Sequence, residues 1–235
     1  MHEAQKLLGK LTHTAQIFLE GHPQLANLEA MLTIFGQKPF VPHTPPKGMQ
    51  DDINWWSDCL ATKAPPSPIP TPRPPIDLYA YSDASSSIGI GIYIQGQWRV
   101  WYLQLGWNTD GHDIGWAESV GFELLTHALL CIVQPGSALL VYGDNQGVIE
   151  AWHCGRSRNR HINHLFKQLV PELICTNCDV ITWYVPSRGN PTDPLSRSFF
   201  PSLSLLLPPI DLPGELNQFL INPPGLAAAA DAVHA

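Results

Sequence analysis

Positive charge is scarce through the middle of this chain. Arg99 is the only lysine or arginine between Ile76 and Cys154, a stretch that also holds eight acidic residues. The whole chain has 13 basic and 20 acidic residues and a formal net charge of −7. Residues 155–200 reverse the balance, with six basic residues against three acidic ones. An acidic stretch followed by a basic one favours a metal site beside a phosphate-binding surface, and ordinary surface charge is the alternative.

Long apolar runs are also missing. No run of eighteen apolar residues occurs, so we expect no membrane-spanning helix. The first six residues lack the charged and then apolar pattern of a secretory signal. The five cysteines are odd in number and irregularly spaced, which indicates free thiols in a reducing compartment. We therefore expect an intracellular protein of the nucleus or cytoplasm that is not secreted and does not enter a membrane.

Changes in composition divide the 235 residues into four parts. Residues 1–64 carry apolar side chains at helical spacing and predict a small helical segment. Residues 65–75 hold seven prolines and predict a stiff, extended linker. Residues 76–198 alternate strand and helix patterns and predict the main domain. Residues 199–235 form an apolar, proline-rich tail, and we expect its end to be disordered.

The main domain is predicted to have three strands, a helix, a strand, two helices and a last strand. Short connections between the first three strands make them an antiparallel meander. We therefore expect an α/β fold with a five-stranded mixed sheet flanked by helices and preceded by the small helical segment. The expected strands are residues 78–81, 89–94, 98–103, 138–142 and 180–185, and the expected helices are residues 116–131, 146–153 and 161–174.

Four acidic residues stand where the ligands of such a sheet gather. Asp83 ends the first strand, Glu118 opens the first long helix, Asp144 ends the fourth strand and Asp193 follows the fifth. Strand ends at one edge of an α/β sheet converge, so we expect the four carboxylates to meet. Their repulsion favours a hard divalent cation with oxygen ligands, such as Mg²⁺. Two such ions roughly 4 Å apart would activate a water and stabilise the leaving oxygen of a phosphodiester.

Two parts of this interpretation have alternatives. Glu123 competes with Glu118, but five residues of helix place the two side chains about 140° apart, so only one can face the site. We favour Glu118 because it lies nearest the strand ends.

A turn-forming role is the alternative for Asp83. A structural zinc site is a weaker hypothesis with suitable ligand types; its residues would be His161, His164, Cys175 and Cys178.

Four stretches of the chain each contain one of the four acidic residues. They are Ser82-Asp-Ala-Ser-Ser-Ser-Ile-Gly-Ile-Gly, Gly115-Trp-Ala-Glu-Ser, Tyr142-Gly-Asp-Asn-Gln-Gly-Val-Ile, and a closing Tyr184-Val-Pro-Ser-Arg-Gly-Asn-Pro-Thr-Asp-Pro-Leu-Ser-Arg. In these stretches residues 76–198 resemble a type 1 ribonuclease H domain of the kind fused to retroelement reverse transcriptases. The closing stretch is similar to that of tyrosine-recombinase retrotransposons and related fungal elements. Residues 4–60 resemble the region between polymerase and nuclease, without the polymerase's own Asp-Asp turn.

The resemblance implies a ribonuclease H-like fold and cleavage of the RNA strand of RNA–DNA hybrids. It makes Asp83, Glu118, Asp144 and Asp193 both catalytic residues and ligands of two Mg²⁺ ions, with Mn²⁺ as an alternative. The implied partners are an RNA–DNA hybrid and a reverse-transcriptase polymerase domain. We interpret the chain as the C-terminal part of a reverse transcriptase or a gene left over from one.

Polar and basic residues near the four acids are the predicted contacts to nucleic acid. They are Ser85, Asn145, Gln146, Arg156, Arg158, Asn159 and Arg188. Two departures from the resemblance stand out. The loop of residues 186–190 has no histidine, which many ribonucleases H carry there, and Pro194 directly follows Asp193. Proline is accepted at the first position of a helix, so Asp193 would be both N-cap and ligand.

Two other functions compete with the nuclease. One is a non-catalytic binding module that keeps the fold after loss of the polymerase. The other is a DNA transposase or integrase on the same fold. Such enzymes use a glutamate on a late helix as their last acid, whereas the late acid here is Asp193, so we disfavour this function.

Overall fold

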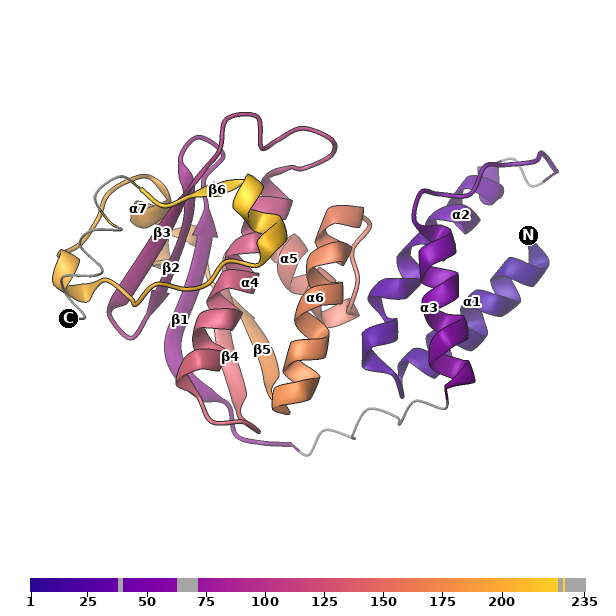
Figure 1. The fold of residues 1–235 in the computed structure, drawn as a ribbon, viewed down its shortest axis with the longest axis horizontal. Helices are drawn as coiled ribbons and strands as arrows, with labels where there is room; N and C mark the ends of the chain where they lie inside the picture. The colour runs from indigo at the N-terminus through magenta and orange to yellow at the C-terminus, as the bar shows by residue number, and fades with distance from the viewer. Residues whose placement is uncertain (38–39, 63–71, 224–225, 227–235) are drawn as a thin grey trace. The chain divides into compact units, whose positions relative to one another are not determined.

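A computed structural model of the chain describes residues 1–37, 40–62, 72–223 and 226 (Figure 1). The chain divides into two compact units, one of residues 1–72 and 151–174 and one of residues 73–150 and 175–235. The first unit thus includes residues 151–174, which the sequence prediction placed in the main domain. Most of the expected linker and of the tail end expected to be disordered lie outside the described residues, so these two expectations stay predictions.

The second unit is an α/β structure built on a mixed sheet. Its strands lie in the order β5-β4-β1-β2-β3-β6. The strands β1, β2 and β3 form the expected antiparallel meander, while β4 runs parallel to both β1 and β5. The bounds are β1 Ile76–Ala84, β2 Gly89–Ile94, β3 Gln97–Leu103, β4 Ala138–Gly143, β5 Asp179–Tyr184 and β6 Leu220–Ile221. The predicted order of elements from the first to the fifth strand is confirmed.

The expected sheet of five strands is wrong by one strand. β6 comes from the tail and pairs antiparallel with β3, through Tyr102 opposite Ile221 and Leu103 opposite Leu220. The sheet therefore has six strands. Two residues are too few to show the alternating pattern of a strand, so the sequence does not predict β6. The strand forms because the edge of β3 offers backbone hydrogen-bonding groups to it.

Helices cover the two faces of the sheet (Figure 1). α4, Ile114–Ile132, packs against β1 and β2. It starts two residues earlier than expected because the Asp113 carboxylate accepts a hydrogen bond from the backbone N–H of Trp116 and caps the helix. A Cβ added to Gly121 of α4 would lie 3.1 Å from Ile90, whereas one added to Gly91 would lie 2.9 Å from Leu195 of α7, Asp193–Ser196. Adjacent residues of a strand face opposite sides, so α4 and α7 lie on opposite faces.

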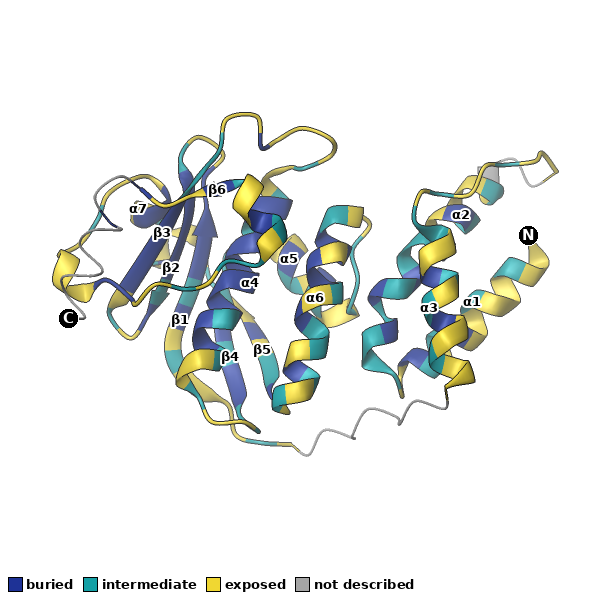
Figure 2. Cartoon of the chain, in the orientation of Figure 1, coloured by how far each residue is buried: buried dark blue, intermediate teal, exposed yellow. Residues whose placement is uncertain are grey.

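The tail completes the core of this unit and does not merely follow its surface. Leu206 packs with Trp98 and Leu195 in one buried cluster. The backbone N–H of Leu207 donates to the carbonyl of Trp98 at 2.8 Å, and Arg99 Nη1 donates to the carbonyl of Leu207 at 2.7 Å. Figure 2 shows the buried residues concentrated on α4 and along the strands. Trp98 is therefore covered by residues that lie about a hundred positions further along the chain.

The first unit is helical, as the sequence predicted for its N-terminal part. Its longer described helices are α1 His2–Ala15, α2 Ala26–Gln37, α3 Met49–Ala61 and the greater part of α6 Arg160–Thr176, and two short 3-10 helices, Leu19–Gly21 and Pro23–Leu25, lie between α1 and α2 along the chain. The buried cluster of α1, α2 and α3 includes Leu11, Leu28 and Trp56. Asp52 is buried and accepts hydrogen bonds from Asn27 Nδ2 at 2.8 Å and Lys167 Nζ at 2.6 Å. A buried carboxylate needs such partners, so Asp52 ties α3 to α2 and α6.

α5, Gln146–Cys154, joins the two units along the chain, since its residues 146–150 belong to the second unit and its last four to the first. No helix in the described part of the chain is long and apolar enough to cross a membrane.

Candidate metal centre

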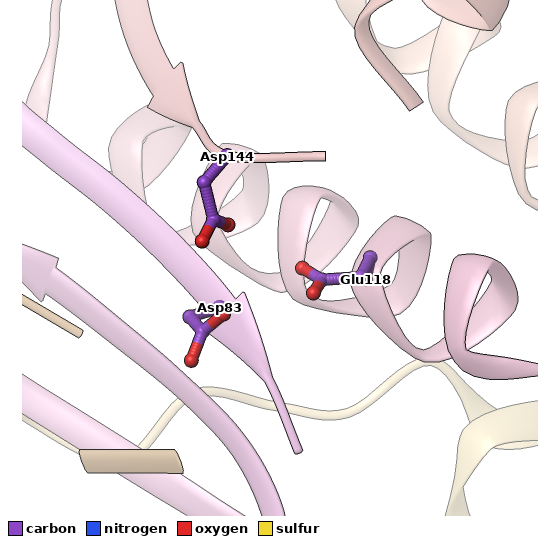
Figure 3. Close-up of side chains that lie close together, drawn as sticks. All are labelled: Asp83, Glu118 and Asp144. Carbon is purple, nitrogen blue, oxygen red and sulfur yellow. The ribbon is translucent and has the colours of Figure 1, made fainter. Parts of the chain in front are cut away.

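Three of the four predicted carboxylates come together in the second unit. One ligand oxygen each from Asp83, Glu118 and Asp144 lies within 4.8 Å of the others (Figure 3). Asp83 comes from β1, Glu118 from α4, and Asp144 directly follows β4. Among the residues that the structure describes, this is the one group of three or more acidic, cysteine or histidine side chains close enough to share a metal ion.

The sheet explains why the two aspartates meet. β1 and β4 are parallel neighbours, with Tyr81 opposite Tyr142. Asp83 and Asp144 each follow two residues after this pair, so both reach the same edge of the sheet. Glu118 approaches from α4, which lies close to β1 because Gly121 has no side chain to hold it away from Ser82. A Cβ on Gly121 would lie 3.1 Å from Cγ2 of Ile90, a tight contact, and 3.4 Å from the Cβ of Ser82.

Glu118, and not Glu123, is the glutamate of the group. The helix rotation that separates them directs Glu123 elsewhere, where it is 1% exposed. Its Oε1 lies 3.6 Å from Nε2 of His127, one helical turn further along α4. Glu118 lies in the second turn of the helix and not the first, because α4 begins at Ile114.

Burial and the charges of neighbouring carboxylates raise the pKa of two members of the group, Asp83 and Glu118. Burial, and then the charges of Asp83 and Asp144, raise the pKa of Glu118 to about 9. Burial also raises the pKa of Asp83 to about 6; Asp144 and Asp193 add to the rise, while a hydrogen bond from Ser196 and the charge of Arg197 oppose it. Glu118 therefore carries a proton at neutral pH when no cation is bound, and a cation would take the place of that proton.

Asp193, the predicted fourth ligand, is not a member of the group of three. The expected N-cap role is wrong, because Asp193 is the first residue of α7 and Thr192 is its N-cap. Oδ1 of Asp193 accepts hydrogen bonds from Nε and Nη2 of Arg197 at 3.1 and 2.9 Å. Asp193 is near enough for its charge to raise the pKa of Asp83. Its role as a ligand stays a prediction.

Two residues that the sequence analysis did not single out contact the aspartates. The Ser196 hydroxyl donates to Oδ2 of Asp83 at 2.5 Å. Asn190 Nδ2 lies 3.4 Å from Oδ1 of Asp144 and donates to the carbonyl of Ser82 at 3.0 Å. Both residues lie in the closing stretch around Asp193. Their position beside a predicted ligand is the sequence feature that could have identified them.

The predicted nucleic-acid contacts of the second unit differ in exposure. Gln146 and Arg188 are exposed, at the start of α5 and in the loop after β5. Asn145 is half-buried, and its Oδ1 accepts from the N–H of Val148 at 3.3 Å, so it caps α5. Ser85 is buried, with its hydroxyl 3.1 Å from that of Ser87. Gln146 and Arg188 are thus the more accessible pair.

The other predicted contacts belong to the first unit. Arg158 is exposed. Arg156 is bound by Glu29, with 2.5 Å between Nη2 and Oε1. Asn159 Oδ1 accepts a hydrogen bond from the N–H of His161 at 2.9 Å. Their role in binding stays a prediction, and Arg158 is the most accessible of the three.

The structure does not support the zinc hypothesis, because the described residues His161, His164, Cys175 and Cys178 do not form a group close enough to share a metal ion. His161 and His164 belong to the first unit, while Cys175 and Cys178 belong to the second, and all five cysteines are free thiols.

No family model, curated protein or solved structure matches this chain.

Proposed function

We propose that the chain is a metal-dependent endoribonuclease with a ribonuclease H-like fold, which cleaves the RNA strand of RNA–DNA hybrids. The observation that carries the proposal is the meeting of Asp83, Glu118 and Asp144 at the ends of two parallel strands and beside α4. The order of strands and helices and the four sequence stretches support it. In this proposal the chain is the C-terminal part of a retroelement reverse transcriptase, and a polymerase domain is its natural partner.

The three carboxylates fit a hard divalent cation. They offer only oxygen donors, which suit Mg²⁺ and Mn²⁺ better than zinc or copper. Two buried or half-buried acids whose pKa values are raised repel each other's charge, and a cation relieves that repulsion. When bound, two such ions would supply an activated water and stabilise the leaving oxygen of the phosphodiester.

The chain's own residues have separate tasks in this proposal. Asp83 and Asp144 provide negative charge at fixed positions on the sheet, and Glu118 exchanges its proton for the cation. Gln146 stands at the first position of α5, and the N-terminus of a helix favours a phosphate. Arg188, exposed after β5, is a further contact for the nucleic-acid backbone.

A second candidate is a binding module that has lost catalysis. Asp193, the expected fourth ligand, is held by Arg197 and stands outside the group of three. The loop of residues 186–190 also lacks a histidine. Such a remnant would bind the hybrid without cutting it.

One experiment separates these candidates. The purified full chain is incubated with end-labelled RNA–DNA hybrid, double-stranded RNA or double-stranded DNA, in Mg²⁺, Mn²⁺ or a chelator. The nuclease cuts only the RNA of the hybrid, needs the cation, and loses cleavage in Asp144→Asn but not in Asp211→Asn, a matched change at an exposed aspartate. Binding of the hybrid without cleavage favours the module, and neither binding nor cleavage contradicts both.

A further inference from the structure

The stretch from Asn190 to Ser196 contacts both aspartates of the candidate metal centre. We propose that this stretch is a rigid brace, in which Ser196 and Asn190 are positioning residues that fix the carboxylates of Asp83 and Asp144 for the cation. The inference rests on the proposed function, because it presumes a divalent cation at these carboxylates. It assigns the closing stretch a role that does not depend on Asp193 as a ligand.

Ser196 fixes Asp83. The serine is fully buried, and its hydroxyl lies 2.5 Å from Oδ2 of Asp83 and 3.1 Å from the carbonyl of Asp193. A hydroxyl has one hydrogen to donate, and an ionised carboxylate is the stronger acceptor. The hydrogen bond holds one carboxylate oxygen in place, while the other oxygen keeps its lone pairs for a cation.

Asn190 holds Asp144 in a similar way. The side chain is 4% exposed, and its Oδ1 accepts hydrogen bonds from the backbone N–H and the hydroxyl of Thr192. These donors fix which end of the amide carries oxygen, so the two N–H groups of Nδ2 face the carbonyl of Ser82 and Oδ1 of Asp144. The amide therefore links the end of β1 to the carboxylate that follows β4.

Packing keeps the brace in place. Leu195, next to Ser196, is 1% exposed and belongs to the buried cluster with Trp98 and Leu206. The glycine at position 91 lets α7 come this close, since a Cβ there would lie 2.9 Å from the Cβ of Leu195. Ser196 cannot leave Asp83 without opening that cluster to water. Asp193 in the same stretch is only half-buried and is paired with Arg197.

The test measures cation binding directly, without cleavage. Free Mn²⁺ is followed by electron paramagnetic resonance while Mn²⁺ is added to the full chain, to Ser196→Ala and to Ser119→Ala. Ser119 is the matched control because it is equally buried and its hydroxyl donates to the carbonyl of Gly115 at 2.8 Å within α4. We expect Ser196→Ala to bind Mn²⁺ about tenfold more weakly, as loss of a hydrogen bond to a ligand does elsewhere. Ser119→Ala should bind Mn²⁺ as the natural chain does.

Two further measurements distinguish positioning from a structural role. Thermal unfolding without cation should give similar midpoints for Ser196→Ala and Ser119→Ala. Cleavage of the hybrid by Ser196→Ala should need about tenfold more Mg²⁺ but reach a near-natural rate at saturating Mg²⁺. A structural defect would lower the rate at every Mg²⁺ concentration. Asn190→Ala is the second variant, and it should also weaken Mn²⁺ binding.

Several outcomes would overturn the proposal. If Ser196→Ala binds Mn²⁺ as tightly as the natural chain does, the positioning role of Ser196 is contradicted, whereas the proposed metal centre is not. Equal losses in Ser196→Ala and Ser119→Ala would show general loosening of the fold. Failure of both Ser196→Ala and Asn190→Ala to fold would assign these residues to stability alone. Absence of Mn²⁺ binding by the natural chain would contradict the proposed function as well.

Discussion

Arg156 donates two hydrogen bonds to Glu29, from Nε to Oε2 at 2.9 Å and from Nη2 to Oε1 at 2.5 Å. This paired geometry uses two of the five N–H donors of the guanidinium, so fewer of them are left for a phosphate. Arg158, two residues further on, is exposed. The two arginines lie in the loop between α5 and α6. The guanidinium of Arg158 is therefore more available to a phosphate than that of Arg156.

The first prediction concerns the salt dependence of binding. Arg158→Ala should lower the log–log slope of hybrid affinity against salt by about 1, the loss of one phosphate contact, whereas Arg156→Ala should leave the slope nearly unchanged. Hybrid affinity over a salt series, measured for both variants, checks this. A slope reduced equally by Arg156→Ala would mean that the pair with Glu29 opens when nucleic acid binds.

The second prediction concerns pH. Folding raises the pKa of Glu118 to about 9, well above that of an unfolded glutamate. The folded chain therefore binds more protons than the unfolded chain between about pH 4.5 and 9, so stability without cation should fall as pH rises through this window. Thermal unfolding in a chelator, from pH 5.5 to 9, should show this fall. Glu118→Gln should flatten it, and a pH-independent midpoint in the natural chain would contradict the raised pKa.

The third prediction separates charge repulsion from packing at the metal centre. Asp144→Asn removes a charge that raises the pKa values of both Asp83 and Glu118. Without cation the variant should therefore unfold at the same temperature as the natural chain or higher, and added Mg²⁺ should no longer raise its midpoint. Calorimetry with and without Mg²⁺ measures both effects. A large drop in the cation-free midpoint would show that Asp144 supports the fold.

The fourth prediction concerns the tail. Leu206→Ala removes a side chain that is 1% exposed and packs on Trp98, so it should lower the free energy of unfolding by about 2–5 kcal/mol. Leu205→Ala, at a neighbouring side chain that is 42% exposed, should change it by about 0.5 kcal/mol or less. Urea unfolding of the two variants gives the comparison. An equal change in the free energy of unfolding for the two variants would mean that Leu206 does not contribute to the buried core.

Local pattern was enough to predict most of the second unit. Runs of apolar or alternating residues mark the strands, and strand ends that must share one edge of a sheet bring Asp83 and Asp144 together. Helix rotation showed that only one of Glu118 and Glu123 can face the site, and nearness to the strand ends favoured Glu118, which is the glutamate of the group.

What the sequence could not show depends on partners far along the chain. Arg156 finds Glu29 across 127 residues, and β6 has too few residues for any period. Ser196 contacts Asp83 only because α7 packs on a glycine of β2. Each of these follows from tertiary packing, which local propensity does not encode.

The late position of the tail has a consequence for biosynthesis. The indole of Trp98 donates a hydrogen bond to the carbonyl of Ser202, which the ribosome adds 104 residues later. Until residues 202–221 are made, the edge of β3 lacks its partner strand β6 and Trp98 lacks the tail residues that cover it. Open edges and bare apolar surface are what chaperones bind and what drives aggregation. The yield of soluble protein from a cell should therefore depend on residues 202–221 far more than their number suggests.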